Sequence, residues 1–165
     1  MLWPSIALLT FVTLQRLAEL VHARRNTAAL LARGAHEIAP GHYPYMVAMH
    51  AAWLLGLWLL ATGRPVEPLW FVIFMGLQGL RVWVLATLKE RWTTRIIVLP
   101  KAPLITSGPY RFLSHPNYAV VIGEIAALPL AFDLPLYALV FSLLNAAILT
   151  VRIRAENAAL RPVRA

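Results

Sequence analysis

Long apolar runs alternate along the chain with short polar segments that hold most of its charged and proline residues. A helix that crosses a bilayer needs about 20 predominantly apolar residues. Five runs approach that length, and each is expected to form a helix: residues 2–22, 45–62, 69–88, 117–132 and 134–151. The last two are short for membrane spans, which is compatible with tilt or a partly interfacial position, and they form a hairpin that turns at residues 132–135. The pattern predicts an all-α integral membrane protein with about five transmembrane helices.

The polar segments are expected to carry turns and a little additional structure. Residues 23–44 are interrupted by glycine and proline and are expected to hold a short interfacial helix at residues 27–33. Residues 95–100 are rich in β-branched side chains, so we expect an extended stretch that is too short to span a membrane. The last helix is expected to continue out of the membrane and to end near Pro162.

Composition supports membrane insertion. Hydrophobic residues make up 60% of the 165 residues, charged residues make up only 13%, and the mean hydropathy is +0.68. A soluble domain of this length is less apolar, so we expect a single membrane-embedded domain over residues 1–165. The first apolar run has no basic residues before it and is expected to be a retained span rather than a cleaved signal peptide. Because the chain has no cysteine, disulfides, thiolate metal ligands and a cysteine nucleophile are excluded, and no metal is expected.

The formal net charge of +8 is better explained by membrane orientation than by nucleic-acid binding, because the basic residues lie between the apolar runs. Twelve of the 15 Lys and Arg residues fall in residues 23–44, in residues 89–116 and in the tail after residue 151. The opposite loops hold only Arg64. This asymmetry predicts that the N-terminus lies outside and that the three basic segments, with the C-terminus, lie in the cytoplasm, and we expect a bacterial inner membrane.

Five titratable groups inside the apolar runs are candidate functional residues. Arg16 and Glu19 share a helix face and can pair, either by reaching the interface or by lining an internal polar cavity. Arg81 is a cation at membrane depth, which makes it a functional-site candidate. Glu124 needs a proton or a partner at that depth, and Arg81 or Arg16 could provide one. A lone histidine such as His50 is more often a structural group than a catalyst.

A polar, turn-rich cluster leads directly into an apolar helix at residues 106–124. Gly108-Pro109 indicates a turn, Pro116 suits the first turn of a helix, and Ser114 is a possible cap. Within nine residues the cluster brings together hydrogen-bond donors, a cation, an imidazole and two phenol rings: Tyr110, Arg111, His115, Asn117 and Tyr118. These groups are candidates for binding a cofactor on the cytoplasmic side.

A second polar stripe lies on the last helix. Arg152 and Glu156 are four residues apart and share a face, and two turns earlier the same stripe reaches Asn145 inside the membrane. Taken alone, the pair Arg152 and Glu156 is expected to be a solvated ion pair that contributes less than about 1 kcal/mol.

The run from Gly108 to Tyr118, GPYRFLSHPNY, followed by Arg152-x-x-x-Glu156, resembles the GPYRYxRHPxYxG and RxxxEE signatures of the isoprenylcysteine carboxyl methyltransferase family. The arginine in GLR at residues 79–81 fits the same family. Members are integral-membrane methyltransferases that use S-adenosylmethionine. The resemblance covers about residues 76–160, which would be the cofactor-binding half.

This resemblance implies roles for the candidate residues. The following residues would bind S-adenosylmethionine, and later its product S-adenosylhomocysteine: Gly108, Pro109, Tyr110, Arg111, His115, Pro116, Asn117, Tyr118, Arg152 and Glu156. Arg81 would face the nucleophilic oxygen of the acceptor, and Glu156 is also a catalytic candidate. His50 or His42 would act as the base if the nucleophile is a phenol. The lipophilic acceptor would enter sideways from the membrane lipids, whereas the cofactor would arrive from the cytoplasm.

More narrowly, the stretches QRLAEL, GHYP, RWTTRIIVLP and RIRAE resemble the bacterial branch found beside type III polyketide synthases. That likeness implies an alkylresorcinol or alkylpyrone acceptor methylated on oxygen, with an isoprenylcysteine-like carboxylate as the other possibility. Two positions depart from the family pattern. Ser114 stands where an arginine is usual, and Asn157 stands where a second glutamate is usual, which leaves Glu156 as the acidic candidate in the tail.

Two other functions are compatible with the sequence. An NADPH-dependent membrane reductase of a related class has a similar polar C-terminal half, but the sequence shows no further basic cluster beyond residues 108–118 for a 2′-phosphate. A small membrane scaffold would use Arg81, Glu124 and the polar loop only to pair helices. Binding of S-adenosylhomocysteine rather than NADPH is the observation that separates these functions.

Overall fold

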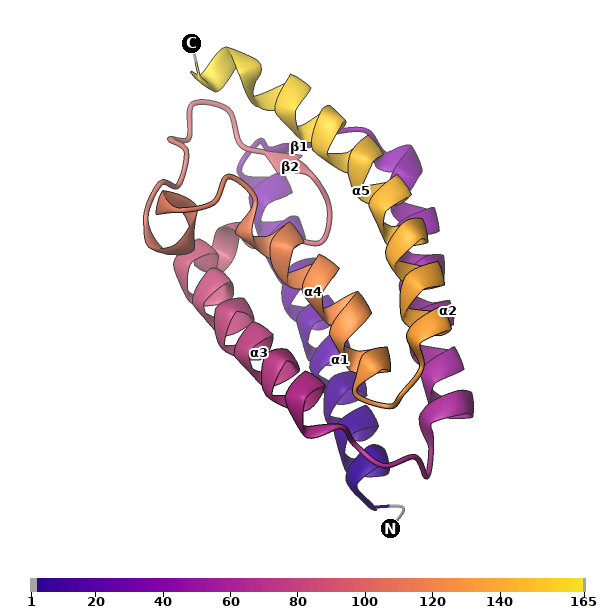
Figure 1. Ribbon diagram of the computed structural model, residues 1–165. Helices are drawn as coiled ribbons and strands as arrows, with labels where there is room; N and C mark the ends of the chain where they lie inside the picture. The colour runs from indigo at the N-terminus through magenta and orange to yellow at the C-terminus, as the bar shows by residue number, and fades with distance from the viewer. Residues whose placement is uncertain (1–2, 165) are drawn as a thin grey trace.

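The computed structural model describes residues 3–164, with side chains as far as residue 160. Five helices lie in this range: α1 (Trp3–Ala32), α2 (Tyr43–Ala61), α3 (Pro68–Leu88), α4 (Pro116–Leu130) and α5 (Pro135–Arg164). They form an elongated bundle with the two chain termini at opposite ends (Figure 1). Helices α1, α2, α3 and α5 are long and apolar enough to cross a bilayer, and α4 is a shorter apolar helix. The prediction of an all-α membrane protein is confirmed.

Helix α1 is longer than the apolar pattern predicts. The separate interfacial helix predicted at residues 27–33 is wrong, because residues 23–32 contain no glycine or proline and extend α1 without interruption. The helix stops at Gly34, whose φ of +86° suits glycine and whose N–H donates to the carbonyl oxygen of Leu31 (3.0 Å). The last turns of α1 therefore reach the segment that follows α3.

Loops at the C-terminal end of the bundle form a small layer over the helix ends (Figure 1). Strand β1 (His36–Glu37) pairs antiparallel with β2 (Ile97–Val98), which confirms that the stretch around residues 97–98 is extended. Short 3₁₀ helices occupy other parts of this layer: η1 (Pro40–His42), η2 (Lys89–Arg91) and η3 (Gly108–Arg111). The partner of β2 lies about sixty residues earlier in the chain, and the sequence did not predict it.

The ends of α4 follow the proline positions. Pro116 begins α4 as predicted, but Ser114 is not its cap; the N-cap residue is His115, which makes no side-chain capping bond. The predicted hairpin turn between α4 and α5 is confirmed, because the N–H groups of Phe132 and Leu134 both donate to the carbonyl oxygen of Pro129. Pro135 then begins α5.

Apolar side chains occupy both the interior and the outside of the bundle. The interior is filled by fully buried side chains from several helices: Leu9, Trp53, Leu57, Phe74, Leu128 and Phe132. The outer faces also carry large exposed apolar side chains, including Phe11, Leu59, Val72 and Leu143. An extensive apolar outer surface is typical of helices that face lipid.

Four charged side chains from three helices form a buried network inside the bundle. Arg81 on α3 donates to Glu124 on α4 (Nε–Oε1, 2.8 Å) and to Glu19 on α1 (Nη1–Oε2, 3.1 Å). Arg16 on α1 donates to both carboxylates, and Gln78 donates to Glu124 (2.8 Å). Only 3% of the Arg81 side chain and 2% of the Glu124 side chain are exposed. Both expected partners of Glu124 are therefore present, and two cations balance two carboxylates.

We expect Glu124→Gln to lower the free energy of unfolding by about 3 kcal/mol or more, because the buried guanidinium of Arg81 and the half-buried one of Arg16 would then share one carboxylate. The midpoint of thermal unfolding in detergent measures the effect. Glu90→Gln is the matched control, since Glu90 pairs with Arg33 at an exposed position where ion pairs contribute little. Equal midpoints for the two variants would contradict a stabilising role for the network.

Candidate functional site

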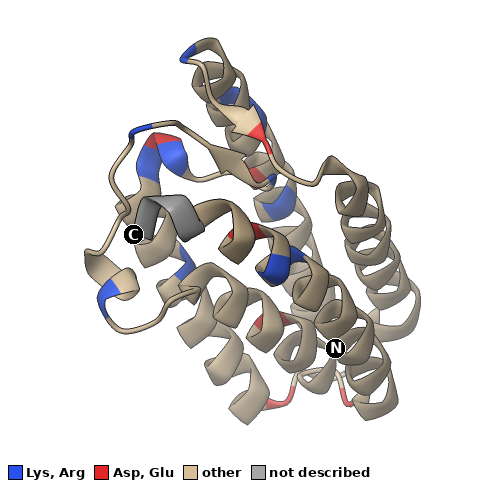
Figure 2. Cartoon of the chain, turned by 90° about the horizontal axis from the view of Figure 1, so that it is seen from above, with Lys and Arg blue, Asp and Glu red and all other residues tan. Residues whose placement is uncertain are grey.

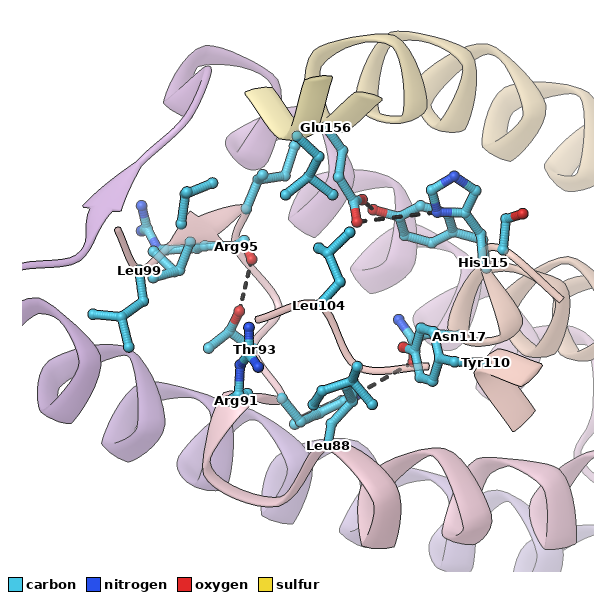
Figure 3. Close-up of a pocket in the computed structure, with 18 of the residues that line it drawn as sticks. Leu88, Arg91, Thr93, Arg95, Leu99, Leu104, Tyr110, His115, Asn117 and Glu156 are labelled. Carbon is cyan, nitrogen blue, oxygen red and sulfur yellow. Dashed lines mark hydrogen bonds and ion pairs between the residues drawn. The ribbon is translucent and has the colours of Figure 1, made fainter. Parts of the chain in front are cut away.

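Two cavities in the described part of the chain share a wall near the C-terminal end of the bundle. The first, which we call the loop cavity, has a volume of about 380 Å³ and lies among the loops, the start of α4 and the end of α5 (Figure 3). The second, the bundle cavity, has a volume of about 310 Å³ and lies between α1, α2, α4 and α5. Of the residues described, five line both cavities: Trp92, Thr93, Asn117, Tyr118 and Arg152.

The loop cavity brings together six of the ten residues predicted to bind a cofactor. They are Tyr110, His115, Asn117, Tyr118, Arg152 and Glu156. Figure 3 shows His115, Tyr110 and Asn117 on one side of the cavity and Glu156 reaching toward them from the last helix. The other four predicted residues, Gly108, Pro109, Arg111 and Pro116, lie outside its lining. Arg111 is exposed and lies over the ring of its neighbour Phe112.

Gly108 shapes the backbone that carries Tyr110 to the cavity. Its φ is +58°, and a Cβ at this position would lie 2.4 Å from Oγ1 of Thr87 on α3. Glycine is therefore required both for the backbone conformation and for the close approach of η3 to α3. Burial, with the nearby Glu156 carboxylate, raises the pKa of Tyr110 to about 12. The phenol stays protonated near neutral pH and can donate a hydrogen bond to a ligand.

The hydroxyl of Tyr118 connects the two charged residues of the last helix. It donates to Oε2 of Glu156 and accepts from Nε of Arg152 (2.8 Å). The predicted solvated pair of Arg152 and Glu156 is therefore wrong, because Arg152 is only 5% exposed and Tyr118 lies between them. The ring of His115 stacks on Tyr118, with centroids 5.3 Å apart, and its Nδ1 lies 4.0 Å from Oε1 of Glu156.

The charged residues that line the loop cavity, among those described, are Glu156 and three arginines. Arg95 is neutralised by Glu37, with both oxygens within 2.8 Å, whereas Arg91 donates to the carbonyl oxygen of Pro103 (2.7 Å). Sequence reasoning missed Arg91 and Arg95. They belong to the segment just after α3, and only the return of that segment over the helix ends brings them to the cavity.

Trp92 and Thr93 contribute the loop side of the shared wall. Nδ2 of Asn26, on the extension of α1, donates to the carbonyl oxygens of Trp92 (2.8 Å) and Lys89 (3.1 Å). The indole Nε1 of Trp92 donates to Oδ1 of Asn117 at the start of α4 (3.3 Å). The loop side of the wall is thus fixed by a contact from α1 and by a contact with Asn117, the wall residue at the start of α4.

The bundle cavity is mostly apolar, and His50 is a polar group in its lining that can exchange a proton. Nδ1 of His50 lies 2.9 Å from the carbonyl oxygen of Met46. A carbonyl oxygen only accepts hydrogen bonds, so Nδ1 carries the proton and Nε2 of the neutral ring can accept one. His42, the other candidate base, lies outside the lining of both cavities, and its Nδ1 donates to the carbonyl oxygen of Ala39.

Arg81 also lines the bundle cavity, but its guanidinium is already engaged. Each of its three nitrogens bonds to Glu19 or Glu124. Glu156, the other acidic candidate, lines only the loop cavity. The predicted catalytic residues are therefore divided between the two cavities.

The model of the isoprenylcysteine carboxyl methyltransferase (ICMT) family matches residues 69–162, which is more than half of the chain. The chain belongs to this family. It is similar to a protein of Bacillus subtilis named "Uncharacterized protein YpbQ", with 39% identity over 98% of this chain and 97% of the relative. A Haemophilus influenzae protein named "Uncharacterized protein" is 27% identical over 82% of this chain and 83% of its own length. No solved structure matches significantly.

Membership in the ICMT family confirms the resemblance carried by the Gly108–Tyr118 run and by Arg152-x-x-x-Glu156. The protein is a membrane methyltransferase in the general sense of that family. The matched residues include all five residues of the shared wall and every residue that lines the loop cavity except Leu30. The likeness therefore covers the part of the molecule in which the two cavities meet.

We expect Gly108→Ala to destabilise the protein by about 1–3 kcal/mol, because alanine would be strained at this φ and would collide with Thr87. Thermal unfolding in detergent and limited proteolysis of the loop after α3 measure the effect. Adding Thr87→Ala should recover part of the loss by removing the collision. Gly76→Ala is the control, since a Cβ there meets no atom within 4 Å; an equal loss in this variant would argue against the explanation.

Proposed function

We propose that this membrane methyltransferase transfers a methyl group from S-adenosylmethionine to an oxygen atom of a lipophilic acceptor. The observation that carries the proposal is the wall of five residues between the loop cavity, which combines polar and apolar groups, and the predominantly apolar bundle cavity. Transfer between a water-soluble donor and a lipid-soluble acceptor requires that each be held in its own environment with the reacting atoms adjacent. Two adjoining cavities that differ in polarity meet this requirement.

The charged and aromatic side chains that line the loop cavity suit S-adenosylmethionine. Arg91 would neutralise the carboxylate of the amino-acid part, and Glu156 would accept hydrogen bonds from its ammonium or its ribose hydroxyls. The aromatic rings of Tyr110, His115 and Tyr118 would contact the adenine. When bound, the cofactor supplies a methyl group on a sulfonium cation, which is a good electrophile for an oxygen nucleophile.

The bundle cavity would hold the acceptor, with His50 as the base. Nε2 of His50 accepts the proton of an acceptor hydroxyl, which makes the oxygen a better nucleophile. Arg152, in the shared wall, lies where it can stabilise the developing oxygen anion. We assign Arg81 a positioning role, because its nitrogens are occupied by the two carboxylates.

The two substrates would arrive from different phases. Lys and Arg are prominent on the loops and helix ends when the bundle is viewed from above (Figure 2), so we propose that this end faces the cytoplasm and that the N-terminus lies outside, in a bacterial inner membrane. Leu17 on α1 and Val47 on α2 both line the bundle cavity and are 55% and 42% exposed. The acceptor would therefore enter from the lipid between α1 and α2.

We expect the purified protein in nanodiscs to bind S-adenosylhomocysteine and not NADPH. The NADPH test is needed because Arg91 and Arg95 line the loop cavity and provide basic residues that the sequence pattern did not reveal. Glu156→Gln should weaken the binding of S-adenosylhomocysteine by roughly 10- to 100-fold through loss of a charged acceptor. Glu90→Gln removes the same charge at an exposed site and should bind normally. Saturable binding of NADPH alone would contradict the proposed methyl transfer and would support the NADPH-dependent reductase.

We expect His50→Gln to reduce turnover by about 100-fold while leaving S-adenosylhomocysteine binding unchanged, because only proton removal is lost. A radiolabelled methyl-transfer assay with an alkylresorcinol, an alkylpyrone and a prenylated cysteine measures it. The loss of turnover should be largest for the acceptor with the least acidic hydroxyl. It should be absent for the carboxylate of the prenylated cysteine, which needs no base. Labelling of the prenylated cysteine alone would show that the acceptor is a carboxylate, and full turnover by the variant on the resorcinol would remove His50 from the mechanism.

A further inference from the structure

Phe112 and Leu113, in the turn between η3 and α4, are apolar side chains on the outside of the molecule. They are 71% and 45% exposed, and their neighbour Arg111 is exposed as well. Neither apolar side chain lines the loop cavity or the bundle cavity. The proposed site therefore does not explain them, although Tyr110 and His115, at the two ends of the turn, both line the loop cavity.

The turn is held against the loop end of α3 (Figure 1). Gly108 approaches α3 so closely that a Cβ there would lie 2.4 Å from Oγ1 of Thr87, and the ring of Phe112 lies beside that of Trp83, with centroids 6.4 Å apart. Trp83 is 47% exposed and lies five residues before the end of a helix that is long and apolar enough to cross a bilayer. The end of such a helix lies at the membrane–water interface, where tryptophan is enriched. The ring of Phe112 therefore lies at the depth of this interface.

The surroundings and the backbone of the turn both suit contact with lipid. Val82, next to Trp83 on α3, is 66% exposed, so Phe112 and Leu113 continue an apolar outer surface of a membrane-spanning helix. The N–H groups of Phe112 and Leu113 both donate to the carbonyl oxygen of Pro109 (3.2 and 3.1 Å). A backbone donor that enters lipid needs such an internal partner. The two residues can therefore leave water without exposing an unpaired donor to the acyl chains.

Arg111 adds a positive charge at the edge of this apolar surface. Its guanidinium carbon lies 5.9 Å from the centroid of the Phe112 ring, and no carboxylate of the described residues forms an ion pair with it. A long basic side chain at a membrane surface lays its stem on apolar groups and directs its charge to the lipid phosphates. Because Arg111 lies outside the lining of the loop cavity, its charge is available for such a contact.

We propose that Arg111, Phe112 and Leu113, together with Trp83, form a membrane-anchoring surface whose partner is a phospholipid. Phe112 and Leu113 enter the boundary between the head groups and the acyl chains, and Arg111 pairs with a lipid phosphate. The turn is then fixed by α3 on one side and by lipid on the other, so the membrane supports the segment that carries two lining residues of the loop cavity. This inference does not depend on which reaction the protein catalyses.

The depth of the turn in the membrane can be measured directly, because the chain has no cysteine and a single nitroxide label can be attached at any cysteine variant of the full-length protein. In nanodiscs that contain phosphatidylglycerol, collisions of the label with oxygen and with a water-soluble nickel complex report its depth. The label at Leu113→Cys should lie about 5–10 Å below the lipid phosphates, and Phe112→Cys provides a second position. Met75→Cys, exposed near the middle of α3, is the lipid reference, and Glu90→Cys, at an exposed ion pair, is the water reference.

Charge reversal tests Arg111 with the same label at residue 113. Arg111→Glu should move the label toward water by several ångströms, because the lipid phosphates repel a carboxylate, whereas Arg111→Lys should keep its depth. Arg24→Glu, at an exposed basic position on α1, is the matched control and should have no effect. An unchanged depth in Arg111→Glu would overturn the phosphate contact.

Two results would overturn the anchoring surface itself. Equal rates of collision with nickel for the labels at residues 113 and 90 would show that the turn lies in water. Shielding of the label at residue 113 from both oxygen and nickel would show that protein, such as a second copy of the chain, covers the turn instead of lipid.

Discussion

The buried network of two arginines and two carboxylates is the constraint on which the bundle depends. An unpaired charge is costly in hydrocarbon, so Arg81 and Glu124 cannot leave each other's neighbourhood without a large loss of free energy. Because Glu19 and Arg16 belong to α1, the same network fixes α1 against α3 and α4. The relative position of three helices is thus set by hydrogen-bonded charges, which is more specific than apolar packing between helices in lipid.

The network also decides which polar groups remain available for chemistry. Arg81 has the position of a functional residue, a cation at membrane depth beside a cavity, yet each of its three nitrogens already donates to a carboxylate. His50 is less conspicuous in the sequence, but it lines the same cavity, and its bond to Met46 uses only Nδ1 and leaves Nε2 free to accept a proton. The role of a polar residue inside a membrane protein can therefore be assigned only after its hydrogen-bond partners have been identified.

The local sequence pattern was sufficient to predict the helices and much of the lining of the loop cavity, because both depend on residues close in sequence. Apolar runs and prolines located α2 to α5, and the cluster from Tyr110 to Tyr118 turned out to line one cavity. Long-range contacts were not predictable in the same way. The extension of α1 carries Asn26, whose side chain bonds to backbone more than sixty residues later in the chain. Tyr118 lies between Arg152 and Glu156 only because α4 packs on α5.

The position of the shared wall explains why the polar motifs occur at helix ends. The proposed reaction between a partner from water and a partner from lipid has to occur where the two phases meet, and the wall lies at the loop end of the bundle. Its loop side is held by Asn26 and by Arg152, which donates to the carbonyl oxygen of Thr94, so α1 and α5 together keep the wall in place. A wall anchored from both sides holds the two cavities in a fixed relative position, and methyl transfer requires such a position because the acceptor oxygen has to contact the methyl group directly.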